Sequence, residues 1–315
     1  MNTKEVIDVA SRYLSELPGK VFDVLSVSKP VSPIAAVNLS KVISKLSPLI
    51  GNMIEINTCE FLNEKKEFMG IGKWRRQDPG FPDVIFDGGV LPVPGFEIKA
   101  WFPLATEITA RFKDSQNHFL DDRTYVAMIA WLPEFLIYGR PKIIGVVIAS
   151  GASVAKARDD HYHNPPDYLV LEPEDTSRRA RNLQQTNTNG YKWQEDGDYV
   201  KEKELEAMAS RMVENWGVEF KNYSPSFEYQ KKVRELLGKF KYRLDTNYAK
   251  MDRIGHPKID EFSRKVYETN FHGRTIGEWN RLLSGGGDRV VKEALSDAFS
   301  IYERNVDGIL VKGGW

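Results

Sequence analysis

Strand-forming runs separated by turn residues restrict the fold of this chain more than any other feature of its sequence. In residues 96–101, FEIKAW, apolar and charged side chains alternate, which is the period-2 pattern of a β-strand. Glu97 and Lys99 are therefore expected on one face of that strand. Three further runs are rich in β-prone residues and are bounded by Pro- or Gly-containing turns, namely residues 83–86, 125–131 and 143–148. Together the runs predict a sheet.

Helical patterns flank the predicted sheet in the sequence. Residues 35–49 carry apolar side chains at three- and four-residue spacing, with Ser32-Pro33 as the entry. Residues 52–68 and 105–119 are also compatible with helices, and long helix-compatible stretches begin again near Lys201. This order of elements predicts an α/β fold in which a mixed central sheet is flanked by helices, with a largely helical C-terminal half.

The chain is expected to divide into three regions along its sequence. These are an N-terminal helical region at residues 1–50, a core with the strand runs at 51–155, and a mostly helical region at 156–315. His161 and His163 lie just after the second boundary in a polar stretch. They could bind zinc, but no second pair of ligands lies at a familiar spacing, so a polar loop is the favoured interpretation.

Composition excludes several classes of protein. The chain is 41% hydrophobic and 28% charged, and its 44 basic residues balance 44 acidic ones, so any surface for a polyanion must be a local patch. Cys59, the one cysteine, excludes a disulfide framework, fits a cytoplasmic location and is favoured as a buried structural thiol over a nucleophile. The first residues look like an amphipathic helix rather than a signal peptide. The apolar runs are shorter than the roughly 20 residues of a membrane span, so no membrane association is expected.

The segments Pro82-Asp83 and Glu97-Ile98-Lys99 form the most informative motif. A hairpin between their two strands would return Glu97 and Lys99 beside Asp83. Two carboxylates then make a hard oxygen site suited to Mg²⁺, which neutralises charge on a phosphodiester and lowers the pKa of an attacking water. Lys99 could hold that water or a non-bridging oxygen. The alternative is a solvated hairpin in which Glu97 and Lys99 form an ordinary surface ion pair.

PD followed by ExK across a hairpin resembles the signature of the PD-(D/E)XK nuclease superfamily, and of type II restriction endonucleases in particular. The resemblance covers roughly residues 50–150 and implies a central sheet of the restriction-endonuclease-like type. It implies metal binding by Asp83 and Glu97 and assistance to the water by Lys99. An acidic residue on the preceding helix often joins them in that family. Glu55 is the candidate for this position, and Glu60 competes with it.

Basic segments are the candidate contacts for double-stranded DNA. Lys73, Arg75 and Arg76 flank Trp74 just before the first strand run, where they could meet phosphates. In a later stretch arginines precede amides that can read base edges in the major groove, so it is the predicted recognition segment: Arg178, Arg179, Arg181, Gln184 and Gln185. A basic, tyrosine-containing stretch at residues 221–253 offers a further face. An ordinary charged surface is the alternative for these segments.

The sequence therefore leads to the expectation of a type II restriction endonuclease that hydrolyses phosphodiester bonds of specific DNA sequences with Mg²⁺. A homodimer is expected because cutting both strands of a palindrome calls for two symmetry-related sites. Two rivals stay open, a repair or nicking nuclease with the same core and a non-catalytic nucleic-acid-binding protein. No phosphate-binding glycine loop, dinucleotide turn or nucleophile elbow in the sequence supports other chemistry.

Overall fold

The computed structural model describes most of the chain in two compact units. The described residues are 1–104, 109–110, 119, 122–163, 170–173, 192–193, 242–244, 249–250, 254–304 and 310–311. The first unit comprises residues 1–108, 122–151 and 257–315, and the second comprises residues 109–121 and 152–256. Both units are discontinuous, whereas the regions expected from the sequence were contiguous, because packing joins segments that lie far apart in the chain.

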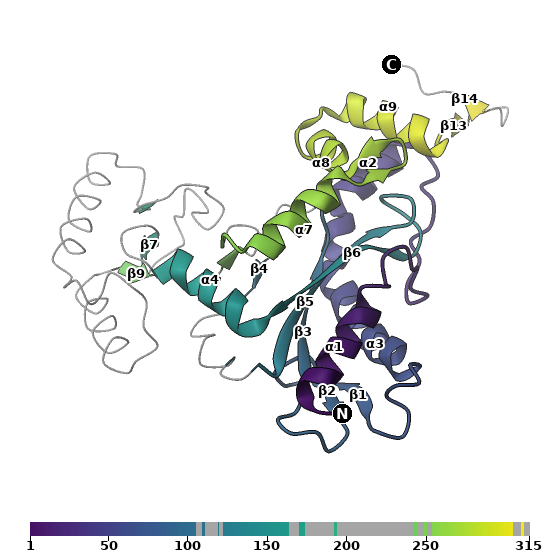
Figure 1. Cartoon of the computed structure of the whole chain (residues 1–315). Coiled ribbons are helices and arrows are strands. Elements are labelled where there is room, and N and C mark those ends of the chain that lie inside the picture. The colour runs from purple at the N-terminus through teal and green to yellow at the C-terminus, as the bar shows by residue number, and fades with distance from the viewer. Residues whose placement is uncertain are drawn as a thin grey trace. The chain divides into compact units, whose positions relative to one another are not determined.

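A five-stranded mixed sheet forms the centre of the first unit, with the strand order β1-β2-β3-β5-β6 (Figure 1). Neighbouring strands are antiparallel except β3 and β5, which are parallel. The predicted α/β class with a mixed sheet is thus confirmed, and each predicted run overlaps a strand. The strands are β1 (Lys73–Arg76), β2 (Val84–Asp87), β3 (Gly95–Trp101), β5 (Thr124–Pro133) and β6 (Pro141–Ser150). Only β1, which is short and strongly charged, was not expected.

The burial of β5 explains its apolar sequence. This strand lies between β3 and β6, and all of its residues except Tyr125 are buried. A strand that is covered on both faces needs apolar side chains at every position rather than at alternate ones. The neighbouring β3 keeps the alternation of its sequence instead, because charged side chains occupy one of its faces.

The N-terminal helices differ from the predicted ones at a proline. The single helix expected at residues 35–49 is divided into α2 (Pro33–Val42), the 3₁₀ helix η1 (Ile43–Leu46) and the start of α3 (Ser47–Asn63). Pro48 occupies the first turn of α3, where its missing N–H leaves no gap in the hydrogen-bond ladder. A continuous α-helix through this proline would instead place its ring against the carbonyl of Ser44. The helix expected at residues 52–68 is therefore shifted towards the N-terminus.

An aromatic cluster fills the space between α3 and one face of the sheet. The Trp74 ring centroid lies 5.6 Å from Phe68, 5.2 Å from Phe86 and 5.5 Å from Phe96. At the end of α3, the Asn63 side chain accepts a hydrogen bond from the backbone N–H of Trp74 at 2.7 Å and donates one to its carbonyl at 2.8 Å. The end of α3 is thus fixed to β1 by polar as well as apolar contacts.

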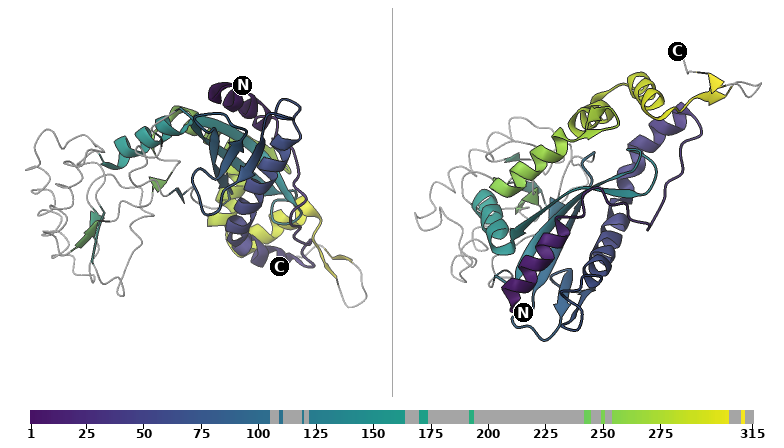
Figure 2. Two further views of the ribbon diagram at one scale, coloured as in Figure 1. Left: turned by 90° about the horizontal axis from the view of Figure 1, so that it is seen from below. Right: turned by 45° about the vertical axis from the view of Figure 1, so that its right-hand side comes forward.

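The other face of the sheet is covered by the C-terminal helix α7 (Pro257–Glu268), as Figure 2 shows. Trp101 points away from the aromatic cluster, and its ring centroid lies 5.8 Å from Phe262 and 5.4 Å from Tyr267. The remaining elements of this unit are α1 (Thr3–Leu14), β11 (Asn270–Phe271), β12 (Arg274–Thr275), α8 (Ile276–Gly285), α9 (Asp288–Phe299), β13 (Glu303–Arg304) and β14 (Leu310–Val311). Helix α9 packs on α2, with Lys41 Nζ 2.8 Å from Asp288 Oδ1.

The second unit is described only in part. Strand β4 (Thr109–Ala110) pairs with β10 (Ala249–Lys250), and β7 (Val170–Pro173) lies between β8 (Lys192–Trp193) and β9 (Tyr242–Leu244). The helix expected at residues 105–119 is wrong at β4, where backbone pairing replaces it, and most of its other residues lie outside the described ones. Helix α4 (Gly151–His163) includes both histidines that were expected in a loop. In the described parts of both units, no helix has the length and apolar character needed to cross a bilayer.

Candidate active site

The register of β2 and β3 places Asp83 opposite Glu97. Val84 pairs with Phe96 and Ile85 pairs with Gly95, so the same antiparallel register continued by one residue aligns the two carboxylates. Gly95 makes this close approach possible. A Cβ atom on Gly95 would lie 2.4 Å from Pro82 Cγ and 2.9 Å from the Val84 carbonyl oxygen. The glycine therefore lets the Pro82-Asp83 segment lie directly against β3.

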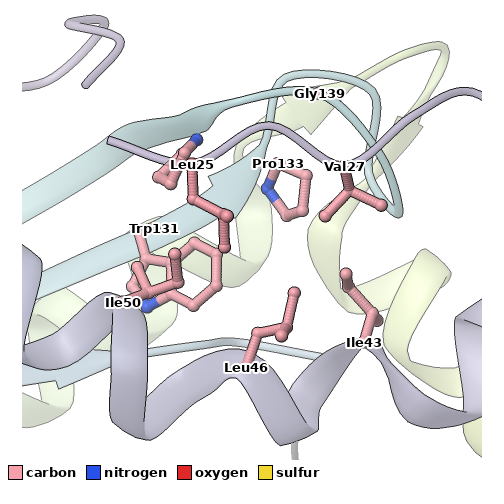
Figure 3. A pocket seen from close by; sticks show the side chains of 9 residues that line it. Leu25, Val27, Ile43, Leu46, Ile50, Trp131, Pro133 and Gly139 are labelled. Carbon is pink, nitrogen blue, oxygen red and sulfur yellow. The ribbon is translucent and has the colours of Figure 1, made fainter. Parts of the chain in front are cut away.

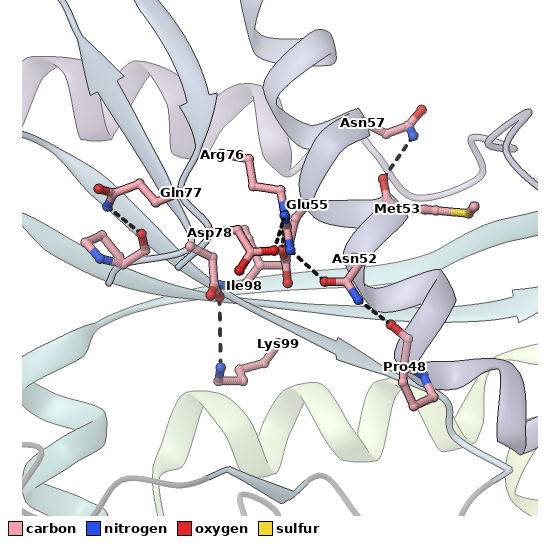
Figure 4. Close-up of polar contacts among 12 residues, drawn as sticks. Pro48, Asn52, Met53, Glu55, Asn57, Arg76, Gln77, Asp78, Ile98 and Lys99 are labelled. Carbon is pink, nitrogen blue, oxygen red and sulfur yellow. Dashed lines mark hydrogen bonds and ion pairs between the residues drawn. The ribbon is translucent and has the colours of Figure 1, made fainter. Parts of the chain in front are cut away.

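Lys99 joins the two carboxylates on the same face of the sheet. Its Nζ atom lies 2.5 Å from Glu97 Oε1 and 4.0 Å from Asp83 Oδ2. The backbone N–H of Ile98 donates a hydrogen bond to Asp83 Oδ2 at 2.7 Å. Figure 4 shows Lys99 projecting from β3 below the sheet, and the dashed line at its ammonium marks the ion pair with Asp83. The structure thus brings together the three groups that the motif predicted.

Burial and like charge destabilise the ionised form of Asp83. Burial raises the pKa of Asp83 to about 7, and the nearby negative charge of Glu97 adds to this effect while Lys99 opposes it. Glu97 itself is only 8% exposed, and its Oε2 atom is buried with no hydrogen-bond partner among the residues that the structure describes. A buried carboxylate oxygen without a partner is costly. A cation between the two carboxylates would stabilise the negative charge of Asp83 and give Glu97 Oε2 a partner.

The donor set of this site fits a hard divalent cation. Two carboxylates and no nitrogen or sulfur ligand suit Mg²⁺, which keeps several waters and needs few protein ligands. No group of three or more His, Cys, Asp or Glu residues able to hold a metal occurs in the described part of the chain. The protein's share of such a site would therefore be Asp83 and Glu97, with the other coordination positions left to water and phosphate oxygens.

Glu55 belongs to a different cluster. Its Oε2 atom accepts a hydrogen bond from Arg76 Nε at 2.6 Å, and the same guanidinium reaches Asp78 and Asn52 at 2.7 Å each. In Figure 4 these groups lie on the α3 side of the sheet, whereas Lys99 projects from the other side. Glu55 raises the pKa of Asp83 by its charge but does not share its site.

Glu60, the alternative to Glu55, and Cys59 both lie on α3 but differ in exposure. Glu60 is exposed on the helix. Cys59 is buried, and burial raises the pKa of its thiol to about 12, which fits the structural role expected for it.

The strand register separates the basic residues of β1 into two sets. Arg75 pairs with Ile85 and Lys73 with Asp87, so both share the sheet face that carries Asp83 and Glu97. Arg75 Nε lies 3.1 Å from Asp87 Oδ2, and both of their side chains are more than half exposed. Arg76 points to the opposite face, into the cluster with Glu55. The predicted recognition segment, with Arg178, Arg179, Arg181, Gln184 and Gln185, lies outside the described residues, as does most of residues 221–253.

A small pocket lies elsewhere in the first unit. It is lined by apolar, proline and glycine residues that include Leu46 of η1, Ile50 of α3 and Trp131 of β5 (Figure 3). Because these residues carry no ionisable side chain, the pocket does not compete with the carboxylate pair as a catalytic site.

Comparisons with known proteins add no relative to this geometry. No protein-family model, curated protein or solved structure matches the chain. The interpretation of the site therefore rests on its residues.

Sequence reasoning missed Gln77, which contacts the backbone on both sides of Asp83. It lies in a loop, QDPGFP, whose proline and glycine residues indicate a turn but not which side chain holds the turn together.

Proposed function

We propose that this protein is a Mg²⁺-dependent endonuclease of the PD-(D/E)XK type, with a restriction-endonuclease-like core, that hydrolyses phosphodiester bonds in double-stranded DNA. One observation carries the proposal. Asp83 and Glu97 are aligned across an antiparallel strand pair with the Lys99 ammonium between them, and a buried oxygen of Glu97 lacks a protein partner. An ordinary surface ion pair would place neither a buried, unpartnered oxygen nor a second, largely buried carboxylate at the same point.

Each residue of the site has a definite task in this reaction. Asp83 and Glu97 would hold the cation, and bound Mg²⁺ would lower the pKa of the attacking water and offset charge on the scissile phosphate. Glu97 would then exchange its contact with Lys99 for the metal. The released Lys99 ammonium can donate hydrogen bonds to the water or to a non-bridging phosphate oxygen. The low exposure of Glu97 strengthens these electrostatic interactions because little water screens them.

Cleavage at specific sequences by a homodimer, as in type II restriction endonucleases, completes the proposal. Lys73 and Arg75 support DNA as the substrate because they share the sheet face of the carboxylates and are exposed. The amide-rich segment around Gln184 and Gln185 remains the proposed reader of the base sequence.

The decisive test uses purified protein, supercoiled plasmid and Mg²⁺. Asp83→Asn, Glu97→Gln and Lys99→Met are each expected to reduce cleavage by at least about 1000-fold while DNA binding is retained. Asp87→Asn is the matched control, because Asp87 is an exposed carboxylate on β2 that shares the sheet face but not the site. It should cleave like the wild type.

The products also decide between related activities. Discrete linear fragments support restriction, whereas persistent nicked circles would point to a nicking or repair enzyme with the same core. Cleavage that survives Asp83→Asn, or wild-type protein that binds DNA without cutting it, would overturn the proposed function.

A further inference from the structure

We propose that Gln77 is a positioning residue that sets the direction of the Asp83 carboxylate for metal binding. This inference rests on the proposed function and extends it to a residue outside the motif. Gln77 follows β1 directly, at the start of the loop that leads to Asp83. Its hydrogen bonds go to the backbone on either side of Asp83 and not to the carboxylates or the ammonium of the site, so it acts through Asp83.

Gln77 holds both peptide groups that flank the Cα atom of Asp83. Its backbone N–H donates a hydrogen bond to the carbonyl oxygen of Asp83 at 2.7 Å. Its side-chain Nε2 donates another to the carbonyl oxygen of Pro82 at 2.8 Å, as Figure 4 shows. The first carbonyl belongs to the peptide after Asp83 and the second to the peptide before it. Fixing both peptides fixes the φ and ψ angles of Asp83, and hence the direction of its Cα–Cβ bond.

The loop holds the Gln77 side chain in place in turn. A Cβ atom on Gly80 would lie 2.7 Å from Gln77 Cβ, so the loop passes against this side chain where only a glycine fits. On the other side, Arg76 connects the loop to α3 through its contacts with Asp78 and Glu55. The neighbouring loop residues therefore hold the glutamine amide in place, and the amide in turn restrains Pro82 and Asp83 through its hydrogen bond.

The carboxylate is restrained at a second point by β3. The Ile98 N–H fixes Asp83 Oδ2, so the aspartate is held at its backbone by Gln77 and at its oxygen by the neighbouring strand. Mg²⁺ demands near-ideal octahedral geometry with short bonds, and small errors in ligand position reduce its affinity. Loss of the Gln77 amide would let the Pro82–Asp83 peptide rotate. The carboxylate would then leave its position opposite Glu97 for part of the time.

The test compares two amide-to-carbonyl hydrogen bonds of similar burial. Gln77→Met keeps the length of the side chain but removes the bond to Pro82. The control is Asn57→Leu, which removes the 2.9 Å bond from Asn57 Nδ2 to the Met53 carbonyl within α3, away from the loop. Mg²⁺ binding is measured by isothermal titration calorimetry, cleavage is measured across a range of Mg²⁺ concentrations, and thermal unfolding reports on stability.

Gln77→Met is expected to weaken Mg²⁺ binding about 10-fold and to raise the half-saturating Mg²⁺ concentration for cleavage by the same factor, in the range typical of residues that orient metal ligands. Cleavage at saturating Mg²⁺ should recover to within about 3-fold of the wild type, because the cation itself can draw the carboxylate back. Asn57→Leu should leave both metal measurements unchanged. If Gln77→Met does not fold, Gln77→Glu keeps the side-chain length and replaces the donor with an oxygen that repels the Pro82 carbonyl.

The two proposals fail in different ways. A wild-type protein that cleaves DNA, together with a Gln77→Met variant whose Mg²⁺ affinity is unchanged, would overturn the positioning role and leave the nuclease proposal intact. Equal loss of Mg²⁺ affinity in Gln77→Met and Asn57→Leu would also overturn it, because a general effect on stability would then explain both. Weakened Mg²⁺ binding in Gln77→Met supports the positioning role even where the wild type cuts no DNA, an outcome that would overturn the nuclease proposal alone.

Discussion

At the scale of single residues, the candidate site holds charge that the fold would be more stable without. Asp83 is mostly buried beside Glu97, and its ionised form is stabilised by Lys99 and by the backbone N–H of Ile98. A site that binds a cation needs this excess of negative charge before the cation arrives. The same excess of negative charge lowers the stability of the metal-free protein. The free energy of unfolding therefore tests whether this excess is present.

Asp83→Asn is therefore expected to stabilise the metal-free protein at pH 8, by about 1–3 kcal/mol in the free energy of unfolding. The pKa of Asp83 is raised from 3.8 to about 7 in the folded state, so between these values the folded protein binds more protons than the unfolded chain. The contribution of Asp83 to the free energy of unfolding of the wild type thus falls as the pH rises from 3.8 to about 7, and it stays low above that pH. Asparagine does not ionise and escapes the loss.

Urea unfolding in the presence of EDTA at pH 4 and pH 8 measures this difference. The gain from Asp83→Asn should be present at pH 8 and nearly absent at pH 4, where the wild-type carboxyl is protonated in the folded state. A gain of the same size at both pH values, or a loss at pH 8, would contradict the origin assigned to the raised pKa of Asp83.

At the scale of elements, the alternation of β1 assigns different tasks to adjacent arginines. Arg75→Ala should change the free energy of unfolding by less than about 0.5 kcal/mol. It should weaken DNA binding, and the salt dependence of that binding should fall by the amount expected for about one lost phosphate contact. Arg76→Ala should lower the free energy of unfolding by about 1–3 kcal/mol, because Glu55 and Asp78 lose hydrogen bonds to a charged partner.

Denaturant unfolding and filter binding at several salt concentrations distinguish the two variants. Should Arg76→Ala keep full stability and lose a phosphate contact, with Arg75→Ala unchanged in binding, the assignment of the two side chains to opposite faces of the sheet would be wrong.

The elements also show what the sequence can and cannot predict. The pairing of Asp83 with Glu97 was predictable because Asp83 directly precedes β2 and Glu97 lies in β3 of the same hairpin, where alternation determines the face. The single helix expected at residues 35–49 was wrong near Pro48, because a proline fits the first turn of a helix but not its interior. The position of Glu55 was not predictable, since helical spacing does not reveal that Arg76 would capture its carboxylate. Gln77 gave no signal, because its role depends on the closed shape of its loop.

At the scale of the whole molecule, the C-terminal helices complete the unit that contains the site. Residues 257–315 belong with the sheet, although residues 152–256 of the second unit come before them in sequence. Phe262 of α7 covers Trp101, and Trp279 of α8 is fully buried. No local pattern in the sequence indicates such long-range contacts, which is why contiguous regions were expected instead.

A chain that ends at His256 is accordingly expected to lose cooperative unfolding and to expose the apolar face of β6 and Trp101. Near-ultraviolet circular dichroism and binding of a hydrophobic dye would record the loss of fixed packing. The full-length protein with Lys258→Ala serves as the control, because Lys258 is an exposed residue at the start of α7. A truncated chain that still unfolds in one sharp transition would show that the sheet does not depend on α7–α9.

The contact between Asn63 and Trp74 has a further consequence for how copies of this protein meet. β1 lies at one edge of the sheet, and an edge strand has unpaired N–H and C=O groups that another chain can bind. The Asn63 amide occupies both groups of Trp74 and so takes the place of a neighbouring strand. The charged residues on either side of Trp74 discourage pairing further. β1 is thereby protected against pairing edge to edge with another sheet, a route that leads from association to fibres.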